Sequence, residues 1–330
     1  MPRQARLDIP GALHHIMVRG INKSDIFKND EDKTRFLERM GQKVSDGKCG
    51  VAAWVLMSNH AHILFKSGKD GISIVMRKLL TWYAQDYNRR HHRTGHLFEN
   101  RYKSILCDEE NYLLTLVRYI HLNPIRAHII RTIEELDRYP WSGHRNLIGK
   151  AEYPWMDSGY VLAQFGGTRR KAVAEYRQFI REGIQEKHNP VYSGGGLVRS
   201  LGGWSQVLAV RRRGETEAAD ERILGSGDFV QTVLKDAEES HLRQLKHRRS
   251  GHTLAKIIDD EIAGAGIHKQ ELKEGSRLRS VSRTRALIAW RGRTELGLSS
   301  AEIARHLGVA TSSITRAIER LGDMEVKQRK

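Results

Sequence analysis

Cysteine is almost absent from this sequence, since only Cys49 and Cys107 occur among its 330 residues. Two cysteines exclude a disulfide-stapled scaffold and a cysteine-rich zinc site. Long apolar runs are missing too, because no stretch approaches the roughly 18 residues of a membrane-spanning helix. The first ten residues hold no apolar segment, which predicts that there is no signal peptide. We therefore expect a reduced, cytoplasmic protein without a membrane partner.

Acidic residues are too few to balance the basic ones. The chain has 39 Asp and Glu against 56 Lys and Arg, which gives a formal net charge of +17. A soluble chain this basic favours a polyanionic partner, above all nucleic acid. Hydrophobic residues make up 39% of the chain, which is enough for a buried core and argues against wholesale disorder.

The first 150 residues alternate strand-like and helix-like patterns, which is typical of an α+β domain. Strands are predicted at 13–18, at 51–65 as a hairpin that turns at Ser58-Asn59, and at 96–106. Helices are predicted at 30–44, 72–90 and 109–121, the last of them ending near Pro124.

The remainder is predominantly helical and falls into two further regions, 151–270 and 277–322. The first is basic and includes a predicted helix at 171–183, a hinge candidate at 193–196, and Arg211–Arg213, either a DNA-binding patch or a solvated helix face. The second reads as a helix from Leu287, a helix at 299–307, a Gly-containing turn and a helix at 311–321. This order is that of a helix-turn-helix. We thus predict three regions: 1–150, 151–270 and 277–322.

His60 and His62 form the first chemistry-bearing pattern. Residues i and i+2 of a strand point to the same face, so both imidazoles converge there. Imidazoles are costly to bury unless they bind a partner, and a divalent metal ion is the obvious partner. The alternative is a pair of histidines on a solvated sheet face.

Tyr119 and Asn123 form the second pattern, because residues i and i+4 share one face of a helix. A tyrosine hydroxyl can act as a nucleophile, and an amide oxygen is a hard metal ligand. The alternatives are a packed tyrosine and a routine helix terminator before Pro124. Taken with the histidines and the positive charge, the pair suits a metal-assisted phosphodiester transfer.

The order of five motifs carries a family resemblance. They are Arg6–His15 followed by Arg19-Gly20, Met57–Leu64, Gly95–Ser104, Arg118–Ala127 and Tyr139–Ser142. Over residues 3–147 the chain resembles the REP-associated tyrosine transposases, which are single-tyrosine HUH transposases related to small bacterial insertion-sequence enzymes.

The resemblance implies a ferredoxin-like antiparallel sheet with flanking helices, followed here by a mostly helical region that ends in a helix-turn-helix. It also implies cleavage and rejoining of single-stranded or hairpin DNA through a 5′-phosphotyrosine. Carried over by position, Tyr119 is the nucleophile, and His60, His62 and Asn123 are ligands of Mg²⁺ or Mn²⁺.

Candidate DNA contacts lie beside these motifs and in the tail. Near the histidines they are Arg19, Arg101 and Lys103 for phosphates, with Tyr102 or Trp82 for stacking on bases. Five further histidines either join the site or are structural: His14, His15, His91, His92 and His96. The tail resembles the C-terminal DNA-binding domain of the chromosomal replication initiator, which implies duplex contacts by Thr311, Ser312, Ser313 and Arg316. The alternative for the tail is a small packing domain.

Three functions remain open from the sequence. The first is a metal-dependent DNA strand transferase; the second is a DNA-binding regulator that keeps the fold but no longer transposes; the third is a replication-type HUH nickase. His60, His62, Tyr119 and Asn123 favour an enzyme, and the lack of a helicase P-loop argues against the nickase. The sequence leaves the DNA target and the oligomeric state open.

Overall fold

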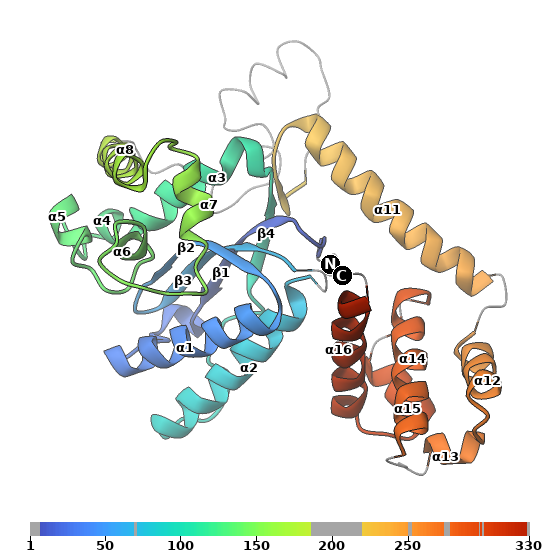
Figure 1. Ribbon diagram of the computed structural model, residues 1–330. Helices are drawn as coiled ribbons and strands as arrows, with labels where there is room; N and C mark the ends of the chain where they lie inside the picture. Colours follow the sequence, from blue (N-terminus) through green and yellow to red (C-terminus); the bar gives the residue numbers. More distant parts are fainter. Residues whose placement is uncertain are drawn as a thin grey trace. The chain divides into compact units, whose positions relative to one another are not determined.

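The chain forms two compact units in the computed structural model, residues 1–232 and 233–330, here called the core unit and the tail unit (Figure 1). The structure describes residues 7–68, 71–185, 220–249, 253–273, 278–296, 298 and 300–328. The hinge candidate at 193–196 and Arg211–Arg213 lie outside these residues. The predicted borders at residues 150 and 270 stay predictions.

A mixed sheet organises the core unit. Its strands are β1 (Leu13–Arg19), β2 (Gly50–Leu56), β3 (His60–Lys66), β4 (Lys103–Cys107) and β5 (Ile223–Leu224). They lie in the order β2-β3-β1-β4-β5, and neighbours are antiparallel except for β4 and β5, which are parallel. With one helix between β1 and β2 and another between β3 and β4, the first four strands form a ferredoxin-like sheet. The predicted α+β fold is confirmed.

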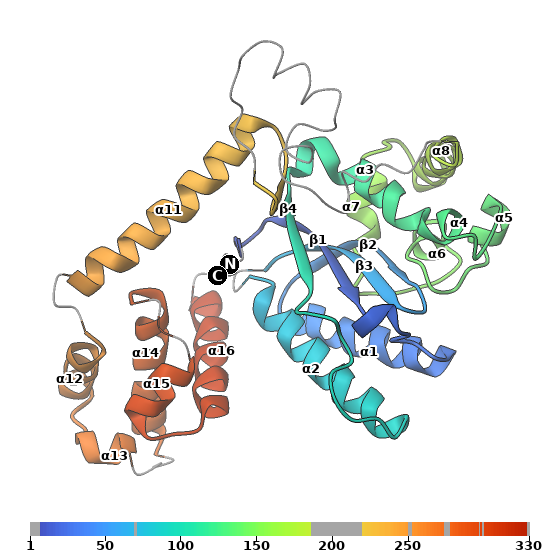
Figure 2. The same ribbon diagram turned by 180° about the vertical axis from the view of Figure 1, so that it is seen from behind.

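Three long helices cover the two faces of this sheet. Helices α1 (Asp30–Asp46) and α2 (Ser73–Arg90) lie side by side on one face (Figures 1 and 2). Helix α3 (Glu109–His121) packs on the other face, against β2 and β3. Because strand side chains alternate between faces, two covered faces require apolar residues at nearly every position. All residues of β2 after Gly50 are buried accordingly.

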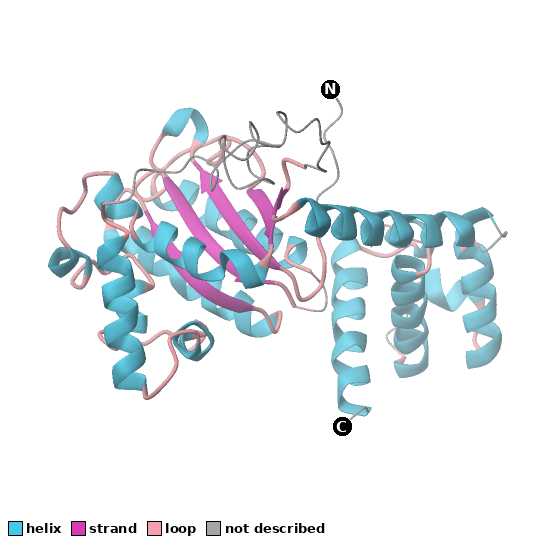
Figure 3. Cartoon of the chain, turned by 90° about the horizontal axis from the view of Figure 1, so that it is seen from above, coloured by secondary structure: helices cyan, strands magenta, loops and turns pink. Residues whose placement is uncertain are grey.

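Short elements complete the core unit and close both sheet edges. They are η1 (Ile21–Lys23), α4 (Asn123–Arg126), α5 (Ile133–Leu136), α6 (His144–Leu147), α7 (Ser158–Ala163) and α8 (Arg169–Glu182). Figure 3 shows the strands with helices on both sides. Isolated bridges from Ser142 and Met156 cover β2, and β5 covers β4. An unpaired strand edge is a template for aggregation, so this cover protects the sheet.

The strand predicted at 96–106 is wrong in its first half. Only Lys103–Cys107 pair with β1 along a ladder, whereas Phe98 makes a single bridge to Gly20. Residues 97–99 still bond to the end of β1, through Ile21 N–H to the Leu97 carbonyl and Glu99 N–H to the Arg19 carbonyl, but the register shifts between Phe98 and Lys103. Local apolar alternation at 97–102 therefore does not extend the ladder.

The tail unit has an apolar core of its own. Helix α11 (Gly227–Arg249) begins in the core unit, and α12 (Leu254–Ala265), α13 (Lys269–Lys273), α14 (Arg279–Thr294), α15 (Ser300–Leu307) and α16 (Thr311–Gln328) follow. Ile257, Ile288, Ile303 and Ile314 belong to one buried cluster. Three helices lie in 277–322 as predicted, with a turn at Gly308, whose φ is +65, but the first begins at Arg279 and not at Leu287. Among the described residues, no helix is long and apolar enough to span a membrane.

A buried polar chain joins α3 to the outer helices of the core unit. Asp137 Oδ1 lies 2.9 Å from His144 Nε2, and the Tyr176 hydroxyl lies 2.8 Å from both His144 Nδ1 and His121 Nδ1. Burial lowers the pKa of His121 and His144, although Asp137 opposes this effect at His144. Burial also lowers the pKa of His14, in β1, to about 4. These three imidazoles are therefore neutral in the folded protein near pH 7.

We expect the core unit to lose stability as the pH falls from 6.5 toward 4. Over this window the unfolded chain, with ordinary histidine pKa values near 6.5, binds more protons than the folded chain. Each of the three histidines then lowers the free energy of unfolding by up to about 1.4 kcal/mol per pH unit. Denaturant titrations of the metal-free protein between pH 5 and 7.5 measure the slope, and His144→Gln should reduce it. A flat profile in the wild type contradicts the assignment.

Candidate functional site

The sheet face beneath α3 carries a row of histidines. In the β1–β3 register, His60 pairs with Arg19 and His62 pairs with Met17. His15 precedes Met17 by two residues in β1 and pairs with Leu64. Because alternate residues share a face, His15, His60 and His62 all belong to this one. We call these three residues the histidine face. The predicted convergence of His60 and His62 is found, and their ring centroids lie 5.2 Å apart.

Tyr119 lies against the histidine face. Its side chain is buried, and its ring centroid is 5.9 Å from that of His15 and 6.0 Å from that of His62, in edge-on contacts. The helix docks through the apolar side that the sequence predicts, and all of these side chains are buried: Leu113, Leu116, Val117 and Ile120. The structure therefore brings together a tyrosine and histidines that are distant in the sequence.

Polar contacts fix both ends of α3. At its first residue, the Glu109 carboxylate accepts a hydrogen bond from Lys66 Nζ at 2.6 Å and contacts the Tyr160 hydroxyl. At its last residue, His121 binds Tyr176 of α8. One turn earlier, the Arg118 guanidinium lies 4.3 Å from the Phe179 ring centroid. Contacts at both ends hold Tyr119 over the sheet.

Both candidate histidine ligands use their Nδ1 atoms in hydrogen bonds. His60 Nδ1 lies 2.6 Å from Asn59 Oδ1, and His62 Nδ1 lies 2.9 Å from His15 Nε2. Burial lowers the pKa of His60 to about 4, and the nearby positive charge of Arg19 adds to the effect. His60 is thus neutral near pH 7, which is the state in which imidazole binds a metal.

Asn123 is half-buried at the start of α4, directly after the tyrosine helix. Its Nδ2 donates to the Tyr119 carbonyl at 2.9 Å and to the Ile120 carbonyl at 3.4 Å. The amide nitrogen is thus committed to the end of α3, and Oδ1 is the atom suited to a cation. Nitrogen and amide-oxygen donors fit a divalent ion with positions open to phosphate. Over the described ranges, no cluster of three or more His, Cys, Asp or Glu side chains suits a metal.

Cationic side chains surround this face. Arg19 and Lys103 are exposed, and by strand register both lie on the same face as His62; Arg101 is exposed just before β4. The sequence analysis did not single out Arg126, although it lies in the motif Arg118–Ala127. Its guanidinium is 5.4 Å from the Tyr119 ring centroid, and Nη1 donates to the Tyr119 carbonyl at 3.4 Å.

The remaining candidate residues lie in other environments. His14 lies on the opposite sheet face beside Ser104, and His91 binds the Asp32 carboxylate between α1 and α2. His92 and His96 are exposed in the loop after α2. The stacking predictions are not supported, because Tyr102 is buried with its hydroxyl toward Ser73 and cations lie over the Trp82 ring.

In the tail unit, the candidate DNA contacts are exposed at the start of α16: Thr311, Ser312, Ser313 and Arg316. They follow the turn at Gly308, as the sequence predicts for the front of a second helix. Ile314, between them, faces the tail core.

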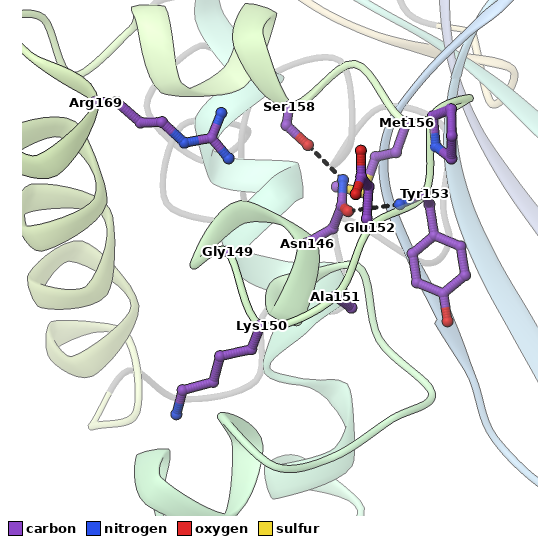
Figure 4. Close-up of a pocket in the computed structure, with 10 residues that line it drawn as sticks. Asn146, Gly149, Lys150, Ala151, Glu152, Tyr153, Met156, Ser158 and Arg169 are labelled. Atoms are coloured by element: carbon purple, nitrogen blue, oxygen red, sulfur yellow. Dashed lines mark hydrogen bonds between the residues drawn. The ribbon is translucent and has the colours of Figure 1, made fainter.

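A separate polar pocket of about 590 Å³ lies in the segment that covers β2 (Figure 4). The Asn146 side chain lines this pocket. Its Nδ2 donates to Ser158 Oγ at 2.5 Å, and its Oδ1 accepts from the Tyr153 backbone N–H at 2.8 Å. Lys150 and Arg169 also line it. No residue of the histidine face takes part.

Comparison with known proteins bears on the core unit. Residues 10–123 match the family model described as "Transposase IS200 like", so the predicted resemblance is confirmed for this part of the chain. A solved structure titled "Structure of the REP associates tyrosine transposase bound to a REP hairpin" is similar at a TM-score of 0.37 and 18% identity, covering 47% of this chain and 89% of that one. No match was found among curated proteins.

We expect the protein to bind one Mn²⁺ ion at the histidine face. Replacing His60 or His62 with Ala removes one of its nitrogen ligands and should weaken binding at least tenfold, as measured by calorimetry. His96→Ala, which removes an exposed histidine, is the matched control. Equal affinity in all of these variants would exclude the histidine face as the metal site.

Proposed function

We propose that this chain, which matches the IS200-like transposases over residues 10–123, cleaves and rejoins single-stranded or hairpin DNA through a covalent phosphotyrosine at Tyr119. The observation that carries the proposal is the contact of the Tyr119 ring with His15 and His62. A tyrosine beside two imidazoles on a cation-rimmed sheet face suits attack on a phosphodiester.

The proposed reaction has two steps. Tyr119 Oη attacks phosphorus, the bond to the 3′ oxygen breaks, the phenol proton passes to water, and the leaving oxygen takes up a proton as a free 3′-hydroxyl. In the second step a 3′-hydroxyl attacks the phosphotyrosine, which restores the phosphodiester and the phenol. A divalent ion at His60, His62 and Asn123 would polarise a phosphate oxygen and orient the scissile group.

The chain's own charges assist both steps. Arg126, whose guanidinium lies over the Tyr119 ring, favours negative charge on the attacking oxygen. Arg19 and Lys103 are exposed on the same sheet face and suit the flanking phosphates. Arg101, just before β4, extends this basic rim.

The tail unit favours a second activity, duplex DNA binding. Exposed hydroxyls and a cation gather at the start of α16, and none of the residues in its first turn is acidic. A helix end with this composition suits phosphate and base-edge contacts. The regulator hypothesis rests on this activity alone, whereas the strand-transferase hypothesis also uses Tyr119.

Tyr119→Phe tests the nucleophile directly. It removes only the hydroxyl, so ring packing, Mn²⁺ binding and hairpin binding should stay unchanged while the covalent protein–DNA adduct disappears. The substrates are labelled single-stranded hairpins from the flanks of the gene, and the readout is the adduct after denaturing electrophoresis, with peptide mapping. Tyr112→Phe, on the same helix, is the control and should keep full adduct. An adduct mapped to Tyr102, Tyr112 or Tyr139 refutes the assignment.

Arg316→Gln tests the tail in the full chain. Loss of one phosphate contact should weaken duplex binding and reduce the slope of log K against log salt by about 1. Hairpin cleavage should remain, because the core unit carries Tyr119. Arg279→Gln, at the start of α14, is the control cation. If Arg316→Gln and wild type bind duplex DNA with the same affinity and salt slope, α16 is not the DNA-reading helix.

A further inference from the structure

His60 and His62, the two candidate ligands of the histidine face, each have a hydrogen-bond partner at Nδ1. We propose that Asn59 and His15 are positioning residues that keep His60 and His62 in the Nδ1–H tautomer, which directs both Nε2 lone pairs toward one divalent cation. The proposal rests on the function proposed above, because it assigns those two imidazoles to a metal. Outer partners of this kind fix ring orientation and tautomer in metal sites.

The tautomer of His60 follows from the bonds of Asn59. Asn59 Nδ2 lies 3.1 Å from the Lys23 carbonyl, which only accepts, so the amide nitrogen must face Lys23. Oδ1 then faces His60, at 2.6 Å from Nδ1. An amide oxygen carries no proton, so Nδ1 is the donor. Neutral His60 therefore has its lone pair on Nε2.

A strained loop supports the Asn59 amide. Asn22 and Lys23 have φ of +50 and +60, a region that residues other than glycine rarely adopt. A Cβ at Gly20 would lie 2.0 Å from the Ser24 carbonyl oxygen, so the loop also requires glycine there. Gly20 N–H donates to the Asn59 carbonyl at 2.9 Å. The loop thus binds Asn59 through its backbone and through its side chain.

His15 does for His62 what Asn59 does for His60. The two rings share one hydrogen bond between His15 Nε2 and His62 Nδ1, so one of these nitrogens carries the proton. If His62 donates, its lone pair lies on Nε2, the atom that would bind a cation; if His15 donates, neutral His62 carries its proton on Nε2 and cannot bind one there. His15 is fully buried, and its Nε2 is turned to His62 rather than to a shared centre. It is thus a partner of a ligand rather than a third ligand.

The first test reads the tautomers without a metal. Nitrogen-15 NMR of the metal-free full chain at pH 7.5 should show Nδ1–H for both His60 and His62. Asn59→Ala should release His60 into a mixture of tautomers and leave His62 unchanged, and His15→Leu should do the reverse. Asn88→Ala is the control, since its amide also donates to a loop carbonyl, that of Gly95. An Nε2–H signal for either wild-type ring overturns the proposal.

The second test measures the consequence for the cation. Asn59→Ala and His15→Leu should raise the Mn²⁺ dissociation constant about 10- to 100-fold. Excess Mn²⁺ should restore adduct formation in both, because Tyr119 is intact. Asn59→Asp and His15→Gln retain an acceptor oxygen, should recover most of the affinity, and replace the first pair if either fails to fold.

The outcomes separate the two proposals. Wild-type Mn²⁺ affinity in folded Asn59→Ala and His15→Leu variants overturns the positioning role and leaves the proposed function standing. Wild-type protein that forms no adduct at saturating Mn²⁺, with both rings in the Nδ1–H tautomer, overturns the proposed function instead.

Discussion

The docking of α3 across the histidine face is the constraint on which the candidate site depends. Leu113, Leu116, Val117 and Ile120 are buried in this contact, and each fully buried aliphatic side chain contributes roughly 1.5–3 kcal/mol. That apolar contact sets the height of the helix above the sheet. The ends are set by polar contacts, through Glu109 at one end and His121 at the other. A tyrosine in the last turn is thereby held at a fixed place over β1 and β3.

The same docking creates an electrostatic difficulty, which the hydrogen bonds of the core unit resolve. Covering a sheet face that carries imidazoles removes them from water, and buried polar groups are costly unless they are paired. His62 is paired with His15, His60 with Asn59, and His121 with Tyr176. For His60 this pairing also decides where the proton lies, because the Asn59 amide oxygen only accepts. A requirement of folding therefore becomes a chemical property of the site.

Local patterns predicted most of the fold and part of the site. Helical periodicity located α1, α2 and α3 to within a few residues, and the i, i+2 spacing of His60 and His62 placed them on one face. His15 was weighed only as one of several extra histidines, because its role depends on the β1–β3 register, a pairing of residues distant in sequence. The pairing of β5 with β4 was missed for the same reason.

The surroundings of the other tyrosines argue for Tyr119 as the nucleophile. Burial raises the pKa of Tyr139 to about 12, and its hydroxyl donates to the Leu56 carbonyl. Burial also raises the pKa of Tyr83 and Tyr176, whose hydroxyls are bound to the Ile26 carbonyl and to two imidazoles. A phenol with a raised pKa and a committed proton is a poor nucleophile. Tyr119 is also buried, but it differs in having the Arg126 guanidinium over its ring and two imidazoles at its edge. The guanidinium favours negative charge on the Tyr119 oxygen, which attack on phosphorus requires.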